Sequence, residues 1–310
     1  MYQTSYTDVH ILNVGAGSCT VIESPSGRVS MIDVNDGGEL RSYEKRSLAE
    51  IYFGTRHLAA DLVDPVIWVQ DRFGSDLWRF ILSHPDADHM SGIRRILRDG
   101  ELRPSNFWDL PHLRRRGRNY SFRTEGARQD WLAYQAFREA GGTATTKLIH
   151  PLAQATGQFW TDDNIEILGP TARLVDDADD KDIYNDASYV MRVRHATSSI
   201  LIPGDVEGPG WDDMLDRGIN LRANVLVASH HGRKTGYSER AMASIRPEIV
   251  IASAANIPEK EDGLPFYRKH TRHVYSTREV GTVTIRMHDS GNVQLFDASG
   301  SLLVALHDAA

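Results

Sequence analysis

Short runs of apolar residues, each ended by a glycine or proline turn, recur along the chain and predict β-strands. The first three runs follow closely on one another, so we expect an antiparallel meander over residues 9–14, 19–24 and 29–34. A fourth run, residues 78–83, leads into a polar segment, and residues 90–98 continue with a helical pattern.

The second half of the chain has the same alternation. Apolar runs predict strands at residues 188–195, 199–202, 224–228 and 249–253, a hairpin formed by residues 282–287 and 293–296, and a helix at 128–140. Strands in both halves with helices between them predict an α/β protein with two mixed β-sheets and outer helices. Without a repeat or linker, we expect a single domain over residues 1–310, with insertions near 101–158 and 162–186.

Charge is distributed unevenly along this 310-residue chain, whose formal net charge is −7. That sign disfavours long-range attraction of nucleic acid, so contact with a polyanion requires a local patch. Residues 101–130 contain seven arginines and four acidic residues, whereas residues 162–186 contain nine acidic and two basic residues. Arg114, Arg115 and Arg116 are candidates for phosphate binding; the open alternative is a solvated basic loop paired with acidic residues 176–182.

Cysteine content and hydropathy indicate the cellular compartment in which the protein is expected. The single cysteine, Cys19, excludes a disulfide framework within the chain and fits a reducing environment. The sequence shows no signal peptide pattern and no apolar stretch long enough to cross a bilayer, so we expect a cytoplasmic protein without membrane contact.

Metal-binding residue types gather where predicted strands end. His84, Asp86, Asp88 and His89 lie within six residues after the run at 78–83. Asp205 follows another strand, and the pair His230-His231 follows a third. Strand ends of this kind converge on a crevice, and mixed imidazole and carboxylate ligands without thiolates favour Zn or Mn in a reactive site.

Simpler interpretations exist for each group. Asp88 would also serve as a helix N-cap, Asp205 as a turn residue, and the histidine pair as side chains bonded to backbone. Asp33 is expected to be structural. Gly15 and Gly17 lack the third glycine of a dinucleotide loop, Cys19 is best explained as a small core residue, and no Gly-x-Ser-x-Gly elbow supports a serine hydrolase.

Taken in order, these motifs resemble the metallo-β-lactamase-fold hydrolases, and most closely the soluble hydrolase domain of ComEC/Rec2 DNA-uptake proteins. The resemblance covers nearly the whole chain. It rests on the glycine turn and cysteine at 14–19, the strand at 31–33, the loop at 83–92, the polar pair Asn185 and Ser188, and the motifs at 204–205 and 229–232. It implies a four-layer αβ/βα sandwich.

The resemblance also implies roles for individual residues. His84 and Asp86 would bind a first divalent metal ion, Asp88 and His89 a second, and Asp205 would bridge the two. One of His230 and His231 would complete the second ion, and the other would bind the oxyanion or protonate the leaving group. Both histidines are therefore candidate ligands. Asp88 and His231 are our candidate catalytic residues, and Asn185, Ser188 and Arg114–Arg116 are candidates for substrate binding.

Two positions depart from the family pattern. Asp86 stands where the fullest motif has histidine, and an oxygen ligand there shifts the expectation from Zn toward Mn. Residues 185–188 supply no histidine where many relatives have a third ligand for the first metal. The first ion is therefore expected to be weakly held.

Three functions remain open at this point. The favoured one is a binuclear metallohydrolase that cleaves phosphodiesters, with DNA or RNA as the expected substrate. The second acts on a small molecule such as a cyclic nucleotide, lactone or other ester. The third is a non-catalytic, metal-stabilised binding module in a defence or DNA-uptake complex, with a protein partner.

Overall fold

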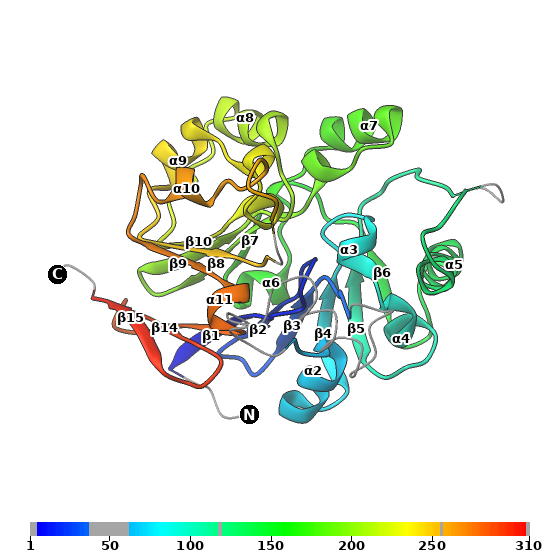
Figure 1. Ribbon diagram of the computed structural model, residues 1–310. Coiled ribbons are helices and arrows are strands. Elements are labelled where there is room, and N and C mark those ends of the chain that lie inside the picture. Colours follow the sequence, from blue (N-terminus) through cyan, green and yellow to red (C-terminus); the bar gives the residue numbers. More distant parts are fainter. Residues whose placement is uncertain (1–4, 37–61, 117–119, 255–256, 308–310) are drawn as a thin grey trace.

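The computed structural model describes residues 5–36, 62–116, 120–254 and 257–307. Its strands form two mixed sheets (Figure 1). The first has the order β15-β14-β13-β1-β2-β3-β4-β5-β6, and the second has the order β12-β11-β10-β9-β8-β7. The predicted meander is confirmed, because β1, β2 and β3 pair antiparallel in sequence order.

The strands of the first sheet are β1 (Tyr6–Ile11), β2 (Thr20–Glu23), β3 (Val29–Ile32), β4 (Asp76–Ile81), β5 (Arg103–Trp108), β6 (Lys147–Ile149), β13 (Val283–His288), β14 (Val293–Phe296) and β15 (Leu302–Leu306). Those of the second are β7 (Ile165–Gly169), β8 (Val190–His195), β9 (Ser198–Ile202), β10 (Val225–Val227), β11 (Ile249–Ala252) and β12 (His273–Ser276). Strands β3 to β6 and β9 to β12 pair in parallel within their sheets.

The helices are α2 (Pro65–Phe73), α3 (Ala87–Met90), α4 (Ile93–Leu97), α5 (Glu125–Glu139), α6 (Gln158–Asp162), α7 (Ala172–Lys181), α8 (Gly208–Asp216), α9 (Glu239–Ile245), α10 (Leu264–Tyr267) and α11 (Thr277–Val280). Short 3₁₀ turns are η1 (Asn185–Ala187), η2 (Ser229–Gly232) and η3 (Lys234–Gly236). Side-chain caps start several helices; for example, Asp64 accepts from two backbone N–H groups at the start of α2.

Strand alternation produces a layered core. Val9 and Ile11 of β1 pack with apolar residues of β8 to β11 in a cluster between the sheets. A second cluster lies between the first sheet and α2, α4 and α5, and a third between the second sheet and α8, α9 and α10. Figure 1 shows these helices on the outer sides, so the expected αβ/βα sandwich is confirmed.

Several elements differ from the expectations. The sequence pattern missed β5, whose Arg-Pro-Ser-Asn start lacks an apolar run, and the short or charged strands β6, β7 and β12. It also missed β15, although this strand is apolar. Residues 101–158 and 162–186 contain β5, β6 and β7, so they are not simply insertions exposed on the scaffold. Cys19 is buried, as expected of a core residue. In the described part of the chain, no helix is both long and apolar enough to cross a membrane.

Candidate metal centre

The predicted ligand loops follow strand ends in both sheets. Residues 83–89 follow β4 of the first sheet, whereas Asp205 follows β9 and the pair His230-His231 follows β10 of the second. Because β3 and β4, and likewise β9 and β10, run in parallel, their carboxyl ends lie at the same edge of each sheet. The two edges meet at this group of side chains.

Four of the predicted ligands form one cluster. Asp88, His89, Asp205 and His231 each offer a ligand atom, and these atoms all lie within 4.8 Å of one another. Asp205 Oδ2 lies 3.2 Å from His89 Nε2 and 3.5 Å from His231 Nε2, and Asp88 Oδ2 lies 3.4 Å from His231 Nε2. Both Nε2 atoms are buried without a hydrogen-bond partner. Two imidazole nitrogens and two carboxylates around one point fit a divalent cation such as Zn or Mn.

The far side of each imidazole is held by a hydrogen bond. Asp33 Oδ2 accepts from His89 Nδ1 at 2.7 Å, and the carbonyl of Ser253 accepts from His231 Nδ1 at 3.0 Å. Each bond keeps a proton on Nδ1, so Nε2 is the nitrogen that faces the cluster. Asp33 also accepts from the backbone N–H and the hydroxyl of Ser83, which agrees with the structural role expected for it.

Unusual backbone angles occur in the η2 turn that carries the ligand candidate His231. His230 and His231 both have left-handed angles, with φ of 50° and 58°. Such angles are strained for residues other than glycine, and strain of this kind concentrates at functional sites. The backbone N–H of His230 donates to the carbonyl of Gly204, next to Asp205, so the two second-sheet ligand loops are joined.

Opposite charges stabilise the cluster. Burial acts to lower the pKa of His89, but the carboxylates of Asp205 and Asp33 outweigh it and raise that pKa well above its usual value. Burial likewise opposes protonation of His231, whose pKa Asp205 raises to about 9. Although burial alone would raise them, the pKa values of the Asp88 and Asp205 carboxyls are held low by the neighbouring histidines. A cation bound at the two Nε2 atoms would displace the protons from those atoms, while the Nδ1 protons stay bonded to Asp33 and Ser253.

The residues predicted for a first ion are arranged differently. His84 Nε2 is buried without a hydrogen-bond partner and lies 3.6 Å from Asp86 Oδ2. However, the other oxygen of Asp86 forms an ion pair with the guanidinium of Arg114. In the described part of the chain, no third His, Cys, Asp or Glu joins His84 and Asp86 in a group like the cluster above. A first divalent ion does not fit this arrangement.

His230 points to a different partner from its neighbour. Its Nδ1 donates to Glu207 Oε1 at 2.9 Å, and the Thr235 hydroxyl lies 2.7 Å from the same nitrogen. Its Nε2 lies 3.7 Å from Asp205 Oδ2, outside the four-residue cluster. The geometry thus favours His231 as a ligand and leaves His230 as a partly exposed imidazole oriented by a carboxylate.

The candidate substrate-binding residues are used in several ways. Ser188 is buried, and its hydroxyl accepts from the backbone N–H of Asp205 and lies 3.2 Å from His84 Nδ1. The backbone carbonyl of Asn185 accepts from the backbone N–H of Ser188. Arg116 pairs with Asp182. This contact agrees with the alternative interpretation, in which the basic loop pairs with the acidic residues 176–182. The exposed Arg115 pairs with Glu139.

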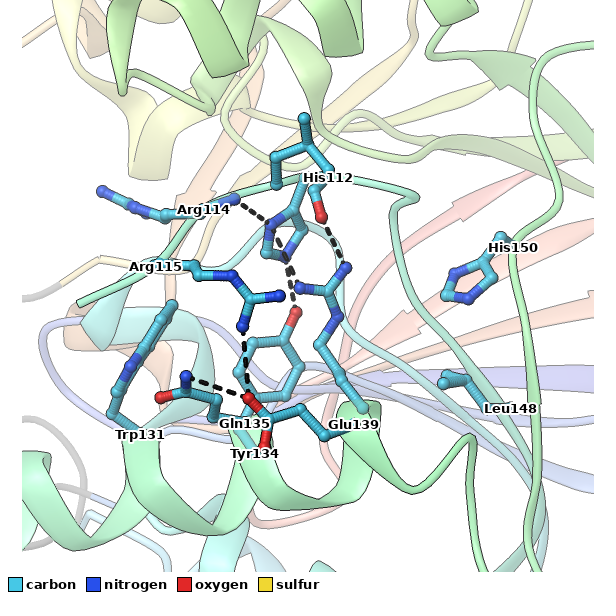
Figure 2. Close-up of a pocket in the computed structure, with 11 residues that line it drawn as sticks. His112, Arg114, Arg115, Trp131, Tyr134, Gln135, Glu139, Leu148 and His150 are labelled. Atoms are coloured by element: carbon cyan, nitrogen blue, oxygen red, sulfur yellow. Dashed lines mark hydrogen bonds and ion pairs between the residues drawn. The ribbon is translucent and has the colours of Figure 1, made fainter. Parts of the chain in front are cut away.

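A pocket lies beside the arginine segment, between residues 112–115 and α5 (Figure 2). His112 lies at its centre, where Nε2 is 2.7 Å from the Tyr134 hydroxyl and Nδ1 accepts from the backbone N–H of Arg114. Burial and the cation of Arg138 lower the pKa of His112 to about 2, so this ring is neutral. The hydrogen bond from the backbone N–H of Arg114 to this ring therefore holds the arginine segment at the edge of the pocket.

Ser253 and Glu207, which orient the two histidines of η2, were not identified from the sequence. Ser253 acts through its backbone carbonyl, so its residue type carries no signal. Glu207 is one carboxylate among many, although its position two residues after Asp205 is a cue.

Comparison with known proteins agrees with the resemblance inferred from the motifs. The chain is 27% identical over 247 residues to "Recombination protein 2" of Haemophilus influenzae and 22% identical over 294 residues to "ComE operon protein 3" of Bacillus subtilis. These matches cover 79% and 91% of this chain but only 24% and 33% of the relatives, so the chain corresponds to a part of each. No protein-family model matches the chain.

Among solved structures, the fold is similar to that of Igni18, described as a metallo hydrolase, from Ignicoccus hospitalis. The TM-score is 0.50 at 14% identity, and the match covers 89% of this chain and 98% of that one. At this identity the likeness concerns the fold, and the chain has the metallo-β-lactamase fold.

Proposed function

We propose that the chain is a metal-dependent hydrolase that cleaves phosphodiesters, in a nucleic acid or a small molecule. The observation that carries this proposal is the cluster of Asp88, His89, Asp205 and His231, with two buried Nε2 atoms that lack a hydrogen-bond partner. A divalent cation bound there would supply a nucleophilic hydroxide at neutral pH and neutralise developing negative charge. The names of the similar proteins, which refer to recombination and the ComE operon, favour a nucleic-acid substrate.

His230 is suited to transfer a proton. Glu207 fixes its Nδ1 proton, so Nε2 is the nitrogen that exchanges a proton with a substrate oxygen. Its side chain is 20% exposed, in contrast to the nearly inaccessible His89. We assign it the role of donating a proton to the leaving oxygen, while His231 serves as a ligand.

The proposal is tested by hydrolysis of single-stranded DNA, double-stranded DNA, RNA and bis-p-nitrophenyl phosphate with added Mn or Zn. We expect the double variant Asp88→Ala/His89→Ala to lose more than about 100-fold in rate, because two ligands of the cation are gone. Arg98→Ala/Asp99→Ala, which removes an exposed ion pair, is the matched control and should retain activity. Equal rates for the two double variants would refute the proposal.

A panel of cyclic nucleotides, lactones and thioesters separates the two substrate classes. Turnover of these compounds without cleavage of any polynucleotide would assign the site to small molecules. If the metal-loaded protein turns over none of these compounds, the chain is assigned to the third class, the non-catalytic, metal-stabilised binding modules.

A further inference from the structure

Arg114 occupies a defined position beside the candidate metal centre. Its guanidinium pairs with Asp86, and the same Nη1 donates to the carbonyl of Pro85 at 2.7 Å. Both acceptors belong to the loop that also supplies Asp88 and His89. The arginine therefore contacts the ligand loop directly, although it is 28 residues away in sequence from Asp86.

The other side of Arg114 is anchored in a separate part of the fold. Its Nε donates to Asp182 Oδ1 at 3.0 Å, just after α7, and its guanidinium carbon lies 4.6 Å from the centre of the Tyr184 ring. Its backbone N–H donates to His112. With these contacts the side chain is only 7% exposed. Such a planar group held on both sides is not a mobile surface cation.

This arrangement conflicts with a divalent ion on His84 and Asp86. The ion would share the Asp86 carboxylate with a guanidinium that is already paired with it, and two cations that close repel each other. Of the ligands predicted for that ion, Asp86 is paired with Arg114 and Asp205 belongs to the four-residue cluster. His84 is left as its one dedicated ligand, because residues 185–188 contain no histidine. The guanidinium already supplies the positive charge that the first ion would supply.

We propose that Arg114 takes the place of the first metal ion, so that the chain holds one divalent cation, in the four-residue cluster, with a fixed guanidinium beside it. This inference rests on the proposed metal-dependent function and specifies its charge arrangement. The planar guanidinium of Arg114 is a hydrogen-bond donor suited to a phosphoryl oxygen, the role that arginine has in many phosphate-binding sites.

Metal content tests the inference without any activity measurement. The full chain is equilibrated by dialysis against a series of buffered free Mn²⁺ concentrations, and bound metal per chain is measured by mass spectrometry, with electron paramagnetic resonance on the same samples. We expect saturation at one ion per chain and the spectrum of an isolated Mn²⁺. Two ions with an exchange-coupled spectrum would overturn the inference and leave the proposed function intact. No bound ion would overturn both.

Two variants test the role of Arg114 itself. Asp86→Ala should still bind one ion with the affinity of the wild type, whereas a two-ion site would lose one. Arg114→Ala frees Asp86, so its metal content should rise above one ion per chain. Arg116→Ala, which removes another partner of Asp182 but no contact with Asp86, is the matched control and should stay at one. If Arg114→Ala also stays at one ion, Arg114 is not the group that excludes the first metal.

Discussion

Asp33 shows how a residue that does not contact the proposed cation can determine whether it binds. One oxygen accepts from the backbone N–H of Ser83, and the other accepts from the Ser83 hydroxyl and from His89 Nδ1. Its backbone N–H donates to the carbonyl of Ile81 at the end of β4. The carboxylate thereby selects the His89 tautomer whose Nε2 is free for metal.

Replacing Asp33 by Asn reverses that selection. The amide NH₂ would face His89 Nδ1, and the ring proton would move to Nε2, where it opposes metal binding. We expect Asp33→Asn to weaken Mn or Zn binding by about 10- to 100-fold, as measured by calorimetric titration. Asp213→Asn, in a buried carboxylate of α8 that pairs with Arg173 and Arg217, is the control for general destabilisation. Unchanged affinity in Asp33→Asn would show that the tautomer is set by other contacts.

At the scale of elements, the glycine turn between β1 and β2 packs against the metal-ligand loop. A Cβ on Gly17 would lie 2.4 Å from the carbonyl oxygen of Asp88 and 2.2 Å from the Asn35 amide nitrogen, and its φ of +148° is unfavourable for other residues. Next to it, the backbone N–H of Ser18 donates to that same carbonyl. The turn thus fixes the backbone of Asp88.

Gly17→Ala should therefore affect both stability and metal binding. We expect a loss of about 2–4 kcal/mol in the free energy of unfolding, from the strained angle and the displaced carbonyl, together with weaker metal binding. Gly27 also has a positive φ, of 77°, but a Cβ added there would meet open space. Gly27→Ala should therefore lose only about 1 kcal/mol in the free energy of unfolding and bind metal normally. Denaturant unfolding and metal titration of the two variants make the comparison. Equal losses would mean that the close approach at Gly17 is not important.

The elements differed in how far the sequence could predict them. The proximity of Asp88, Asp205 and His231 could be predicted, because each follows an apolar strand, and strand ends of this kind converge. The contact between Arg114 and Asp86 could not be predicted, since it depends on how residues 112–116 dock on the Asp182 turn after α7. β5 was missed because its polar start is paired between two neighbouring strands, a tertiary effect that outweighs local propensity.

At the scale of the whole molecule, the cluster joins the two sheets. Asp88 and His89 follow a strand of the first sheet, whereas Asp205 and His231 follow strands of the second. A cation held by all four would link layers that otherwise contact each other mainly through the apolar cluster between them. Metal binding should therefore stabilise the complete fold.

Thermal unfolding measures this link. At a free metal concentration of about 100 times Kd, binding adds about 2.7 kcal/mol, which for a chain of this size raises Tm by roughly 4 °C. A chelator should reverse the rise. Asp205→Asn should abolish the rise, whereas Asp213→Asn should keep it. A metal-dependent rise that persists in Asp205→Asn would place the stabilising ion elsewhere.

The pairing of β1 with β13 has a consequence for how the protein is made. Tyr6 lies opposite His288 in this antiparallel pair, so β1 is synthesised long before the strand that pairs with its outer edge. Until then one edge of the β1–β3 meander has unpaired backbone N–H and C=O groups, available to another nascent chain. The interval of greatest exposure to aggregation therefore spans nearly the entire synthesis of the described fold, and it ends when β13 is released.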